Sequence, residues 1–525
     1  MEYAASRFHI AVSRLPGGGG MKLPRGIGPG AIAFLALWLI LLAGGRSNFL
    51  RDPGTFWHVA TGERILGGGF LRTDPYTFTF PNTWWVPYQW LGEVAMALMH
   101  RAAGFDGLLL GSVTILAAIF AWLTVRLLDT GLHPIAVAVI IFFGVAASSS
   151  HFHVRPHLFT IAGMAITMAL LVDVEAGRIP LKRMLWLVPL YVIWVNVHGG
   201  VLGGMATLVL AAAGWIFAWR IGWPSPVQSV RDAAWILGIA AACCATAFVN
   251  PYGTDLIKTW YVIMGEPVLR QIIQEHSPLT WSDPTAWPIL GFAGLYLIIL
   301  AGAPVHRMRV TWLLPVVWFL LTLDRVRHAP LFAVLTLIGM ASLWPQTRWA
   351  EWLKRNRPDF YQPNERERTP LWANVWLPAV VVLLSFVLQC AHVNVPLIGA
   401  SWARHDARHW PVELIDVLKD NEPRDGRNNH IFNDYIDGGF VIYHAPGYKV
   451  FVDDRCEVFG GDWLLKLVNA SGENTAGAIV EWERTYGSFN YALTRTDSGF
   501  DGYFANSPAW ECLKRTESAA FYKRK

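Results

Sequence analysis

The sequence predicts a mainly helical membrane protein of about eleven spans that ends in a soluble α/β domain. Of its 525 residues, 54% are hydrophobic and only 15% are charged, whereas about 25% are charged in an ordinary soluble protein. The apolar residues fall in long blocks up to residue 391, beyond which charge rises and the apolar runs shorten to strand length. We therefore divide the chain into a cytoplasmic N-terminal segment (1–26), a multi-span domain (27–391) and an extracytoplasmic domain (392–525).

The composition excludes several classes of protein. The net charge of +5, from 43 basic and 38 acidic residues, is too weak and dispersed for nucleic-acid binding. Five cysteines are too few for a disulfide scaffold. Cys456 and Cys512 lie in the polar tail, where they either stay free or pair with each other if the tail faces an oxidising compartment.

Eleven segments have the composition of membrane-spanning helices, which need about 20 mostly apolar residues. In chain order they are Gly28–Gly45, Gly107–Leu128, Pro134–Ala147, His157–Val172, Met184–Val197, Val201–Trp219, Ala233–Val249, Trp287–Ala303, Val310–Leu323, Ala329–Trp344 and Ala373–Ala391. Gln89–Ala103 also has a helical pattern, but it is short and carries Glu93, His100 and Arg101. We expect this segment to lie along the membrane interface, within a first outer loop of about residues 46–106.

The distribution of basic residues predicts which side of the membrane each loop faces. Met1–Arg25 holds four basic residues against one acid, so it belongs in the cytoplasm. If Gln89–Ala103 does not cross, the later basic loops also face inward. They contain Arg178, Lys182 and Arg183; Arg220 and Arg231; Arg307 and Arg309; and Arg348 to Arg368. We therefore expect a multi-pass protein of the inner or plasma membrane whose C-terminal domain lies outside the cytoplasm.

This topology gathers polar and ionisable side chains at the outer ends of the spans. They are Asp52, His58, Asp74 and Glu93; His151, His153, Arg155 and His157; Asn196 and His198; Asn250, Glu266, Glu275 and His276; and Asp324, Arg325, Arg327 and His328. Ionisable groups near a membrane cost free energy and therefore suggest a function. Arg325 and Arg327 are the clearest case, because they are cations on the side that the charge rule disfavours, and a bound anion would account for them.

Several of these residues also have a structural interpretation that the sequence leaves open. Asp52, which precedes a proline, is a good helix N-cap, and Asp74, which also precedes a proline, suits a turn. Glu93 would suit the solvated face of an interfacial helix, and Arg325 and Arg327 could extend to lipid headgroups.

The sequence has no pattern for a zinc site or for a soluble nucleotide. His151 and His153 form a His-x-His pair, but further zinc ligands at diagnostic spacing do not follow. Asn196 and His198 could be satisfied polar groups at a helix end. No P-loop, dinucleotide fingerprint, G-x-S-x-G or H-E-x-x-H pattern occurs. An enzyme that acts outside the membrane without a nucleotide would need a lipid-carried donor.

An acidic residue follows the first span closely, as Asp52 in Arg-Asp-Pro-Gly-Thr-Phe-Trp-His, and precedes a long outer loop and many spans. Over about residues 28–390 the chain thereby resembles GT-C-type membrane glycosyltransferases, the group of protein O-mannosyltransferases, the aminoarabinose transferase of lipid A and bacterial Rgt-like transferases. Five stretches resemble a bacterial subgroup: Asp74-Pro-Tyr-Thr-Phe-Thr-Phe, Trp90-Leu-Gly-Glu, Asn196-Val-His-Gly-Gly, Asn250-Pro-Tyr-Gly and Arg327-His-Ala-Pro-Leu-Phe. Mannosyltransferases show an Asp-Glu pair and a His-Pro-Pro-Leu stretch, whereas here Pro53 follows Asp52 and the second stretch reads Tyr88-Gln-Trp-Leu91.

The resemblance implies an inverting transfer of a sugar from a polyprenyl-phosphate donor to a hydroxyl of a glycan, lipid or protein acceptor. Asp52 would take the hydroxyl proton, and Asp74 would orient the acceptor or act as a second carboxylate. Candidates for binding the donor phosphate are Arg155, His157, Arg325, Arg327 and His328, the histidines in protonated form. Candidates for binding sugar or acceptor are Trp57, His58, Trp84, Trp85, Glu93, Asn196, His198, Asn250 and Glu275. No cofactor is required, although paired Asp52 and Asp74 could hold a divalent metal.

Residues 392–525 alternate between helix and strand patterns, which is typical of a small α/β layer domain. The predicted helices are Pro411–Leu418, Gly439–His444, Asp462–Asn469 and Ala476–Tyr486. The predicted strands are His430–Asn433, Tyr448–Val452, Phe489–Leu493 and short ones near Glu511–Lys514 and Ala519–Tyr522. Asp453, Asp454 and Arg455 follow a buried strand, where open α/β sheets bind ligands. They form either a salt-bridged loop or a site for an acceptor or glycan.

Two other functions remain open from the sequence. A transporter or flippase of a lipid-linked phosphate compound would use the outer polar groups as a path, although we find no internal inverted repeat. A non-catalytic scaffold would only present the C-terminal domain to partners.

Overall fold

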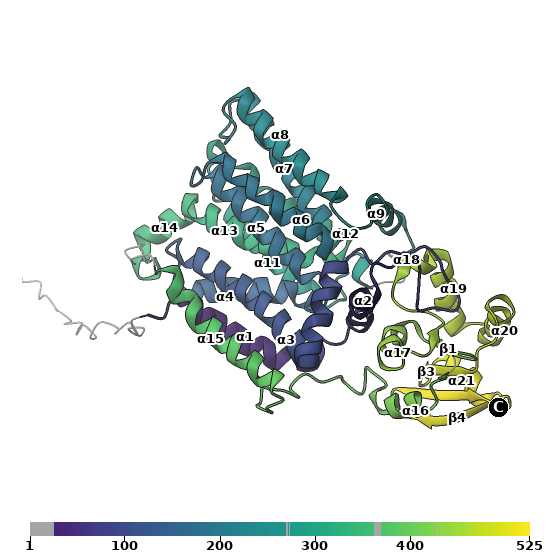
Figure 1. Ribbon diagram of the computed structural model, residues 1–525. Helices are drawn as coiled ribbons and strands as arrows, with labels where there is room; N and C mark the ends of the chain where they lie inside the picture. The colour runs from purple at the N-terminus through teal and green to yellow at the C-terminus, as the bar shows by residue number, and fades with distance from the viewer. Residues whose placement is uncertain (1–25, 269–270, 272–273, 362–368, 425) are drawn as a thin grey trace, which may run out of the picture.

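The computed structural model describes all residues except 1–25, 269–270, 272–273, 362–368 and 425. The predicted N-terminal cytoplasmic segment therefore lies outside the described residues, apart from Gly26. A bundle of helices forms the larger part of the molecule, and a smaller α/β domain lies against one end of it (Figure 1). The predicted fold class, a mainly helical membrane protein with a C-terminal α/β domain, is confirmed.

Each of the eleven segments that the sequence predicts as spans is helical along most of its length. The helices are α1 (Pro29–Asn48), α3 (Trp90–Leu128), α4 (Pro134–Ser148), α5 (Leu158–Glu175), α6 (Leu187–Val197), α7 (Val201–Arg220), α8 (Val230–Ala245), α11 (Ala286–Leu300), α12 (Leu314–Asp324), α13 (Ala329–Leu343) and α15 (Leu371–Cys390). In the part of the chain that the structure describes, eight helices are long and apolar enough to cross a membrane, judged by length and composition. The other three, α6, α11 and α12, have 11, 15 and 11 residues.

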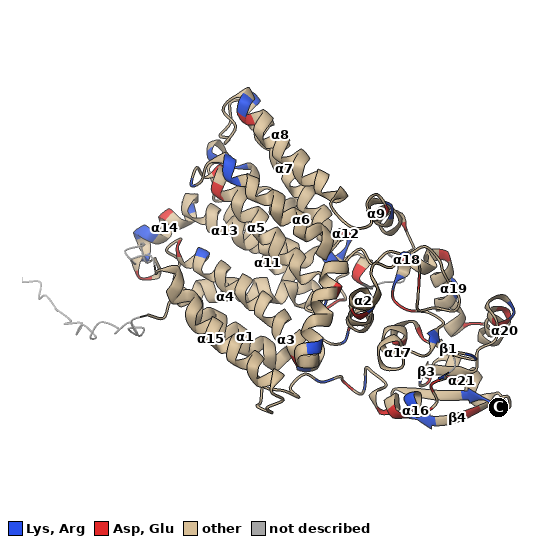
Figure 2. Cartoon of the chain, in the orientation of Figure 1, with Lys and Arg blue, Asp and Glu red and all other residues tan. Residues whose placement is uncertain are grey.

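Helix α13 forms the centre of the bundle. It packs against α4, α5 and α12, and almost all of its side chains are buried. A helix that is apolar on every side lies in a protein core or in lipid, and α13 is the span with the largest buried share, 83%. Lysines and arginines gather at the end of the bundle that lies away from the α/β domain, and the shafts of the helices are almost free of charge (Figure 2).

The predicted interfacial segment and the span after it form one long element, α3, with a break inside. The break falls at Ala103 and Gly104, where the backbone leaves the helical region and residue 104 has a φ of +60° that suits glycine. The part of α3 before the break packs against α2 (Gly54–Gly68), the helix that follows the first span. Gly62 permits this approach, because a Cβ there would lie 2.1 Å from the Glu93 carbonyl oxygen.

The C-terminal domain contains a five-stranded sheet in the order β2-β1-β3-β5-β4. The strands are β1 (His430–Asn433), β2 (Lys449–Val450), β3 (Tyr491–Arg495), β4 (Trp510–Arg515) and β5 (Ala519–Arg524). The helices are α16 (Ile415–Asp420), α17 (Gly438–His444), α18 (Cys456–Phe459), α19 (Gly461–Gly472), α20 (Thr475–Tyr486) and α21 (Gly499–Asn506). Strand β1 pairs in parallel with β2 and β3, whereas β5 runs antiparallel to β3 and β4.

Strand β2 is shorter than the predicted strand Tyr448–Val452. Beyond Val450 the Asn433 side chain takes the place of a neighbouring strand: its Oδ1 atom accepts from the Phe451 N–H at 2.9 Å and its Nδ2 atom donates to the Val452 carbonyl at 2.7 Å. These bonds satisfy the buried backbone without a ladder. The chain is therefore free to turn toward the membrane domain at residues 453–455.

The loop that follows α1, predicted as the first outer loop, completes the C-terminal domain. Residues Tyr76 and Phe78 exchange backbone hydrogen bonds with Val450, so the loop covers the outer edge of β2. Phe56, Trp57, Tyr76, Phe78 and Trp85 of the loop lie in the same hydrophobic core as the C-terminal sheet. The sheet thus buries an edge that would otherwise be exposed. All five cysteines, Cys456 and Cys512 included, are free in the structure.

Candidate active site

Asp52 lies where the first span ends and helix α2 begins. Its Oδ1 atom accepts a hydrogen bond from the Gly54 N–H at 2.7 Å. The N-cap position of α2 is Pro53, so Asp52 lies one residue before the position that the capping interpretation assigns to it. Its Oδ2 atom accepts a second hydrogen bond from Nη1 of Arg155 at 3.0 Å. A Cβ atom at Gly54 would lie 2.7 Å from Asp52 Oδ1 and 3.1 Å from Arg155 Nε, so a glycine is needed there. Asp52 thus binds the first residue of α2 and an arginine 103 residues away.

Arg155 lies between two carboxylates that come from different loops. Its Nη1 atom is also 3.7 Å from Oε1 of Glu275, which follows helix α9 (Asp255–Gly265). Burial opposes ionisation of Glu275, but the charge of Arg155 and then of neighbouring groups that include Arg327 outweighs it and holds the pKa of Glu275 well below its ordinary value. Glu275 therefore favours its ionised form at neutral pH. Asp52 and Glu275 both lie against the guanidinium of Arg155.

Arg327 is fixed by a histidine from the same loop as Glu275. Its Nη1 atom donates a hydrogen bond to Nε2 of His276 at 2.6 Å. Burial, and then the charge of Arg327, lowers the pKa of His276 to about 3, so the ring is neutral and accepts the bond. Arg325, the other predicted phosphate ligand of this turn, lies 3.7 Å from the carboxylate of Asp324.

His157 is held close to the same arginines. Its Nε2 atom donates a hydrogen bond to the His151 carbonyl oxygen at 2.7 Å. Burial, and then the charge of Arg155, lowers the pKa of His157 to about 4. The low pKa favours the neutral ring in this arrangement of side chains.

The C-terminal domain brings Asp454 to this end of the bundle. Its Oδ1 atom accepts a hydrogen bond from Nε1 of Trp57 at 2.7 Å. Trp57 lies about one helical turn along α2 from Gly54, whose N–H donates a hydrogen bond to Asp52. Burial, and then the charge of Asp52, raises the pKa of Asp454 to about 8. The surroundings therefore favour the protonated form of Asp454 and the ionised form of Glu275.

Asp52, His153 and Glu275 form a group that could hold a divalent metal ion. One ligand atom from each residue lies within 4.8 Å of the other two. Two carboxylates and one imidazole are donors that suit Zn²⁺ or Mn²⁺. The sequence suggested Asp74 as the partner of Asp52 and showed no further ligands near His151 and His153, whereas the structure supplies them from separate loops.

Asp74 belongs to a second network that is fully buried. Its Oδ1 atom lies 2.7 Å from Nη2 of Arg455, and its Oδ2 atom accepts from the Thr77 N–H at 2.9 Å and the Thr77 hydroxyl at 2.5 Å. Arg455 also donates to both oxygens of Asp453, at 2.8 and 2.6 Å. The side chains of Asp74, Asp453 and Arg455 are all 0% exposed. This arrangement matches the interpretations of Asp74 as a turn residue and of residues 453–455 as a salt-bridged loop.

Two of the predicted sugar-binding tryptophans contact other parts of the protein. The Trp85 Nε1 atom donates a hydrogen bond to Oε1 of Glu457 at 3.0 Å. Trp84 lies under the ammonium of Lys258, which is 4.2 Å from the ring centroid. Trp85 therefore joins the first loop to the C-terminal domain, and Trp84 joins it to helix α9.

The remaining predicted binding residues are held by local partners. His58 Nδ1 and Glu93 Oε1 lie 3.1 Å apart between α2 and α3, at 0% and 1% exposure. Buried at these values, neither side chain is open to a sugar. The other contacts are Asn196 to Trp90 Nε1 and to the Val249 carbonyl, Asn250 to the Tyr252 N–H, His198 to the Thr160 hydroxyl, and His328 to the Leu321 carbonyl.

His153 and His276 are the residues to which sequence reasoning assigned no role. Both stand among the polar groups predicted at the outer ends of the spans, and that placement is the one signal the sequence carries for them. Their partners lie far away in the chain, since His153 meets residues 52 and 275, and His276 meets residue 327. Spacing along the sequence cannot reveal such contacts.

Comparison with known proteins gives matches only at the level of structure. No protein-family model matches the chain, and no curated protein matches it in sequence. Among solved structures, an oligosaccharyltransferase of Archaeoglobus fulgidus, in complex with Zn and sulfate, has a TM-score of 0.44 at 12% identity and covers 88% of this chain and 68% of its own. ArnT of Cupriavidus metallidurans, bound to undecaprenyl phosphate, has a TM-score of 0.40 at 12% identity and covers 94% and 97%.

Proposed function

We propose that this protein is a membrane glycosyltransferase that moves a sugar from a polyprenyl-phosphate donor to an acceptor hydroxyl at the outer face of the membrane. One observation carries the proposal: Asp52 pairs with Arg155 in a cluster with Glu275 and Arg327, at the end of the bundle that meets the C-terminal domain. A carboxylate beside fixed cations is the arrangement that sugar transfer from a phosphate ester requires. The GT-C resemblance of the sequence supports the same reaction.

In this reaction the acceptor hydroxyl attacks the anomeric carbon of the donor sugar. The hydroxyl proton passes to a carboxylate oxygen of Asp52, the new glycosidic bond forms, and the bond from the anomeric carbon to the phosphate oxygen breaks. The polyprenyl phosphate leaves with the bonding electrons as an anion. A single displacement of this kind inverts the configuration at the anomeric carbon. A positioned base typically contributes about 10²–10⁴-fold to such a rate.

Arg155 and Arg327 are the cations best placed to stabilise the leaving phosphate. A guanidinium has five N–H donors, and Asp52 takes only one hydrogen bond from Arg155. Arg327 is held by neutral His276, so it keeps its charge without a carboxylate hydrogen bond at that nitrogen. Fixed donors in a site away from bulk water stabilise developing charge strongly.

Asp454 is suited to the acceptor side of the reaction. It comes from the C-terminal domain and accepts a hydrogen bond from Trp57. Trp57 lies one turn along α2 from Gly54, whose N–H binds Asp52. Because burial and the charge of Asp52 raise the pKa of Asp454, the residue in its protonated form can donate a hydrogen bond to an acceptor oxygen as well as accept one. The acceptor would then be a glycan, lipid or protein hydroxyl held between the two domains.

A divalent metal would bind at Asp52, His153 and Glu275, whose donor atoms fit one. When bound, such an ion would supply positive charge toward the phosphate oxygens of the donor. The steps above use only the side chains of the chain itself.

Donor cleavage in reconstituted vesicles tests the proposal. The substrate is a polyprenyl phosphate carrying a radiolabelled sugar, offered with a panel of glycan, lipid and peptide acceptors, and the measurement is the free polyprenyl phosphate and the labelled product. Arg327→Ala should weaken donor binding by about tenfold, the loss of a charge-assisted hydrogen bond. Arg72→Ala is the matched control, because Arg72 is an outer arginine in an exposed ion pair with Asp255.

Two outcomes would contradict the proposal. Movement of intact donor across the vesicle membrane without cleavage would identify a transporter or flippase. Wild-type donor affinity in Arg327→Ala would leave contact with lipid headgroups as the role of this arginine.

A further inference from the structure

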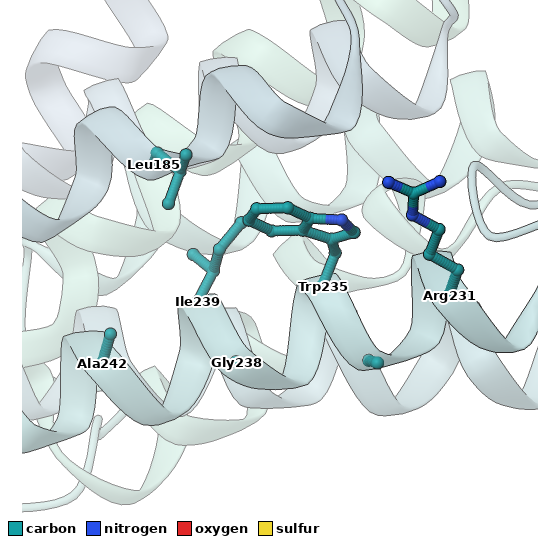
Figure 3. Close-up of a pocket in the computed structure, with 7 residues that line it drawn as sticks. Leu185, Arg231, Trp235, Gly238, Ile239 and Ala242 are labelled. Carbon is teal, nitrogen blue, oxygen red and sulfur yellow. The ribbon is translucent and has the colours of Figure 1, made fainter.

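An apolar groove lies on the lipid-facing side of helix α8, far from the candidate active site. It encloses about 390 Å³. Ala234, Gly238 and Ala242 recur every four residues and line one face of the helix. Trp235 and Leu185, the latter from the turn Leu181–Trp186, project toward each other over this face (Figure 3). Only 33% of the α8 span is buried within the protein, so the groove faces the lipid.

Arg231 stands at one end of this groove. Its side chain leaves α8 on the same side as Trp235, one helical turn away (Figure 3). It is exposed, and among the described residues its guanidinium has no hydrogen-bond or ion-pair partner. Arg231 is the second residue of α8, where the helix dipole disfavours a cation. An anion beside Arg231 would remove this unfavourable interaction.

The groove opens at the basic end of the bundle. The blue and red residues at the tip of α8 lie at the end remote from the α/β domain (Figure 2). Lys182 and Arg183 lie in the turn that packs on α8, and both are exposed. Basic residues at this end match the negative surface of a cytoplasmic leaflet.

The length of the groove fits a lipid chain within one leaflet. Its lining residues on α8 run from 231 to 242, which is about 16 Å along a helix at 1.5 Å per residue. The hydrocarbon core of a bilayer is about 30 Å thick, so half of it is about 15 Å. An acyl chain that begins at Arg231 would end near the middle of the membrane.

We propose that this groove binds an anionic phospholipid of the cytoplasmic leaflet, with its phosphate at Arg231 and one acyl chain beneath Trp235 along Ala234, Gly238 and Ala242. The charge at the headgroup end selects an anionic lipid over a zwitterionic one. The site is separate from the proposed donor site, because it lies at the opposite end of the bundle.

Native mass spectrometry of the detergent-purified full-length protein tests this site. The protein is mixed with dioleoyl phosphatidylglycerol, dioleoyl phosphatidylcholine or undecaprenyl phosphate, and the bound lipids are counted. The wild-type protein should retain more phosphatidylglycerol. Arg231→Gln should lower retention of phosphatidylglycerol about fivefold, the effect of one basic residue near an anionic surface, and leave phosphatidylcholine unchanged.

Two further variants distinguish the contribution of the groove itself from that of basic residues near it. Gly238→Leu should fill the groove and reduce retention of both lipids, and a Cβ atom at position 238 meets nothing within 4 Å that would force the backbone to move. Arg220→Gln removes a basic residue at the end of α7, outside the groove, and should leave both counts unchanged.

Three results would overturn the proposal. Equal retention of the two lipids by the wild-type protein would mean ordinary contact with bulk lipid. Unchanged retention of phosphatidylglycerol by Arg231→Gln would remove this arginine as the headgroup ligand. Preference for polyprenyl phosphate over phosphatidylglycerol would assign the groove to the lipid donor.

Discussion

Asp52 and Asp74 both belong to the first outer loop and both pair with an arginine, yet the two pairs differ in what else they contact. The side chains of Asp74 and Arg455 are 0% exposed; Thr77 binds the carboxylate of Asp74, and Asp453 binds Nε and Nη2 of Arg455, whose Nη1 atom has no partner among the described residues. Asp52 is 7% exposed, and its partner Arg155 is 24% exposed and extends toward Glu275. Asp74 therefore joins the first loop to the C-terminal domain. Asp52, in contrast, lies at the edge of a cluster whose other members, Arg155 and Glu275, are partly exposed.

An aspartate–arginine pair therefore does not by itself indicate a catalytic role for the aspartate. A buried carboxylate whose lone pairs are all occupied has no place for a substrate proton, and breaking its ion pair is costly. A carboxylate that holds one arginine hydrogen bond beside a second acid and a second cation can exchange partners. Variants of Asp52 and its neighbours should therefore change transfer, whereas variants of Asp74 should change stability.

The largest expected effect is the loss of transfer in Asp52→Asn. The amide keeps an oxygen for the Gly54 N–H but removes the base, so turnover should fall by about 10²–10⁴-fold. The measurement is the rate of labelled product formation at saturating donor, with the melting temperature recorded for the same sample. Turnover near that of the wild-type protein would remove Asp52 from the role of base.

For Asp74→Asn we expect a loss of stability without a loss of turnover. Loss of one member of a buried ion pair should lower the free energy of unfolding by about 3 kcal/mol, because Arg455 keeps its charge with one carboxylate instead of two. The protein that remains folded should keep its turnover. Urea unfolding followed by Trp fluorescence gives the first quantity and the transfer assay the second. A loss of turnover at unchanged stability would return Asp74 to the candidate catalytic residues.

A smaller effect is expected from His153→Ala on metal binding. If Asp52, His153 and Glu275 hold a cation, removal of the imidazole should weaken Mn²⁺ binding by about tenfold or more, as measured by calorimetry. His306→Ala is the control, since His306 is an exposed histidine in the loop after α11. Equal Mn²⁺ affinity in both variants would leave the cluster as a site of protein charges alone.

A pH-dependent change of stability is expected in Asp454→Asn. The pKa of Asp454 is raised to about 8 in the folded protein and is about 3.9 in an unfolded chain. Between these values the folded state binds more protons than the unfolded state, so the wild-type protein loses stability as pH rises from about 4 to 8. Asparagine cannot ionise, so the melting temperature of the variant minus that of the wild-type protein should increase across this window and level off above it. A difference that does not change with pH would mean that Asp454 is already ionised at pH 4.

Patterns that depend on neighbours in sequence were predictable. The strand His430–Asn433 and the helix Gly438–His444 follow local hydropathy, and the structure has them where the pattern places them or within one residue. The start of α2 close to Asp52 was predictable for the same reason, although the N-cap position falls on Pro53, one residue later than predicted. Strand Tyr448–Val452 was predicted too long, because Asn433, 18 residues earlier in the chain, binds the backbone of Phe451.

The candidate site was predictable only in part. The positive-inside rule assigns the polar groups to one face, but it treats Asp52 and Asp74 alike, and it leaves His153 and His276 without a role. Their roles depend on contacts between loops more than 50 residues apart, such as Arg327 with His276. Asp454 joins the cluster because α17 and the loop after β2 pack on α2, with Gly439 against the Pro53 carbonyl.

The sequence by itself determined that this protein is a helical membrane protein with a C-terminal α/β domain, since hydropathy and periodicity are properties of consecutive residues. Only the tertiary structure decided which of the few charges are saturated and which are available. Charges are scarce in this chain, at 15% of residues, and most of the polar groups at the outer end are paired. Which groups pair depends on burial and on the approach of distant loops, because the free energy of a charge is set by the groups around it in space and not by its neighbours in the chain.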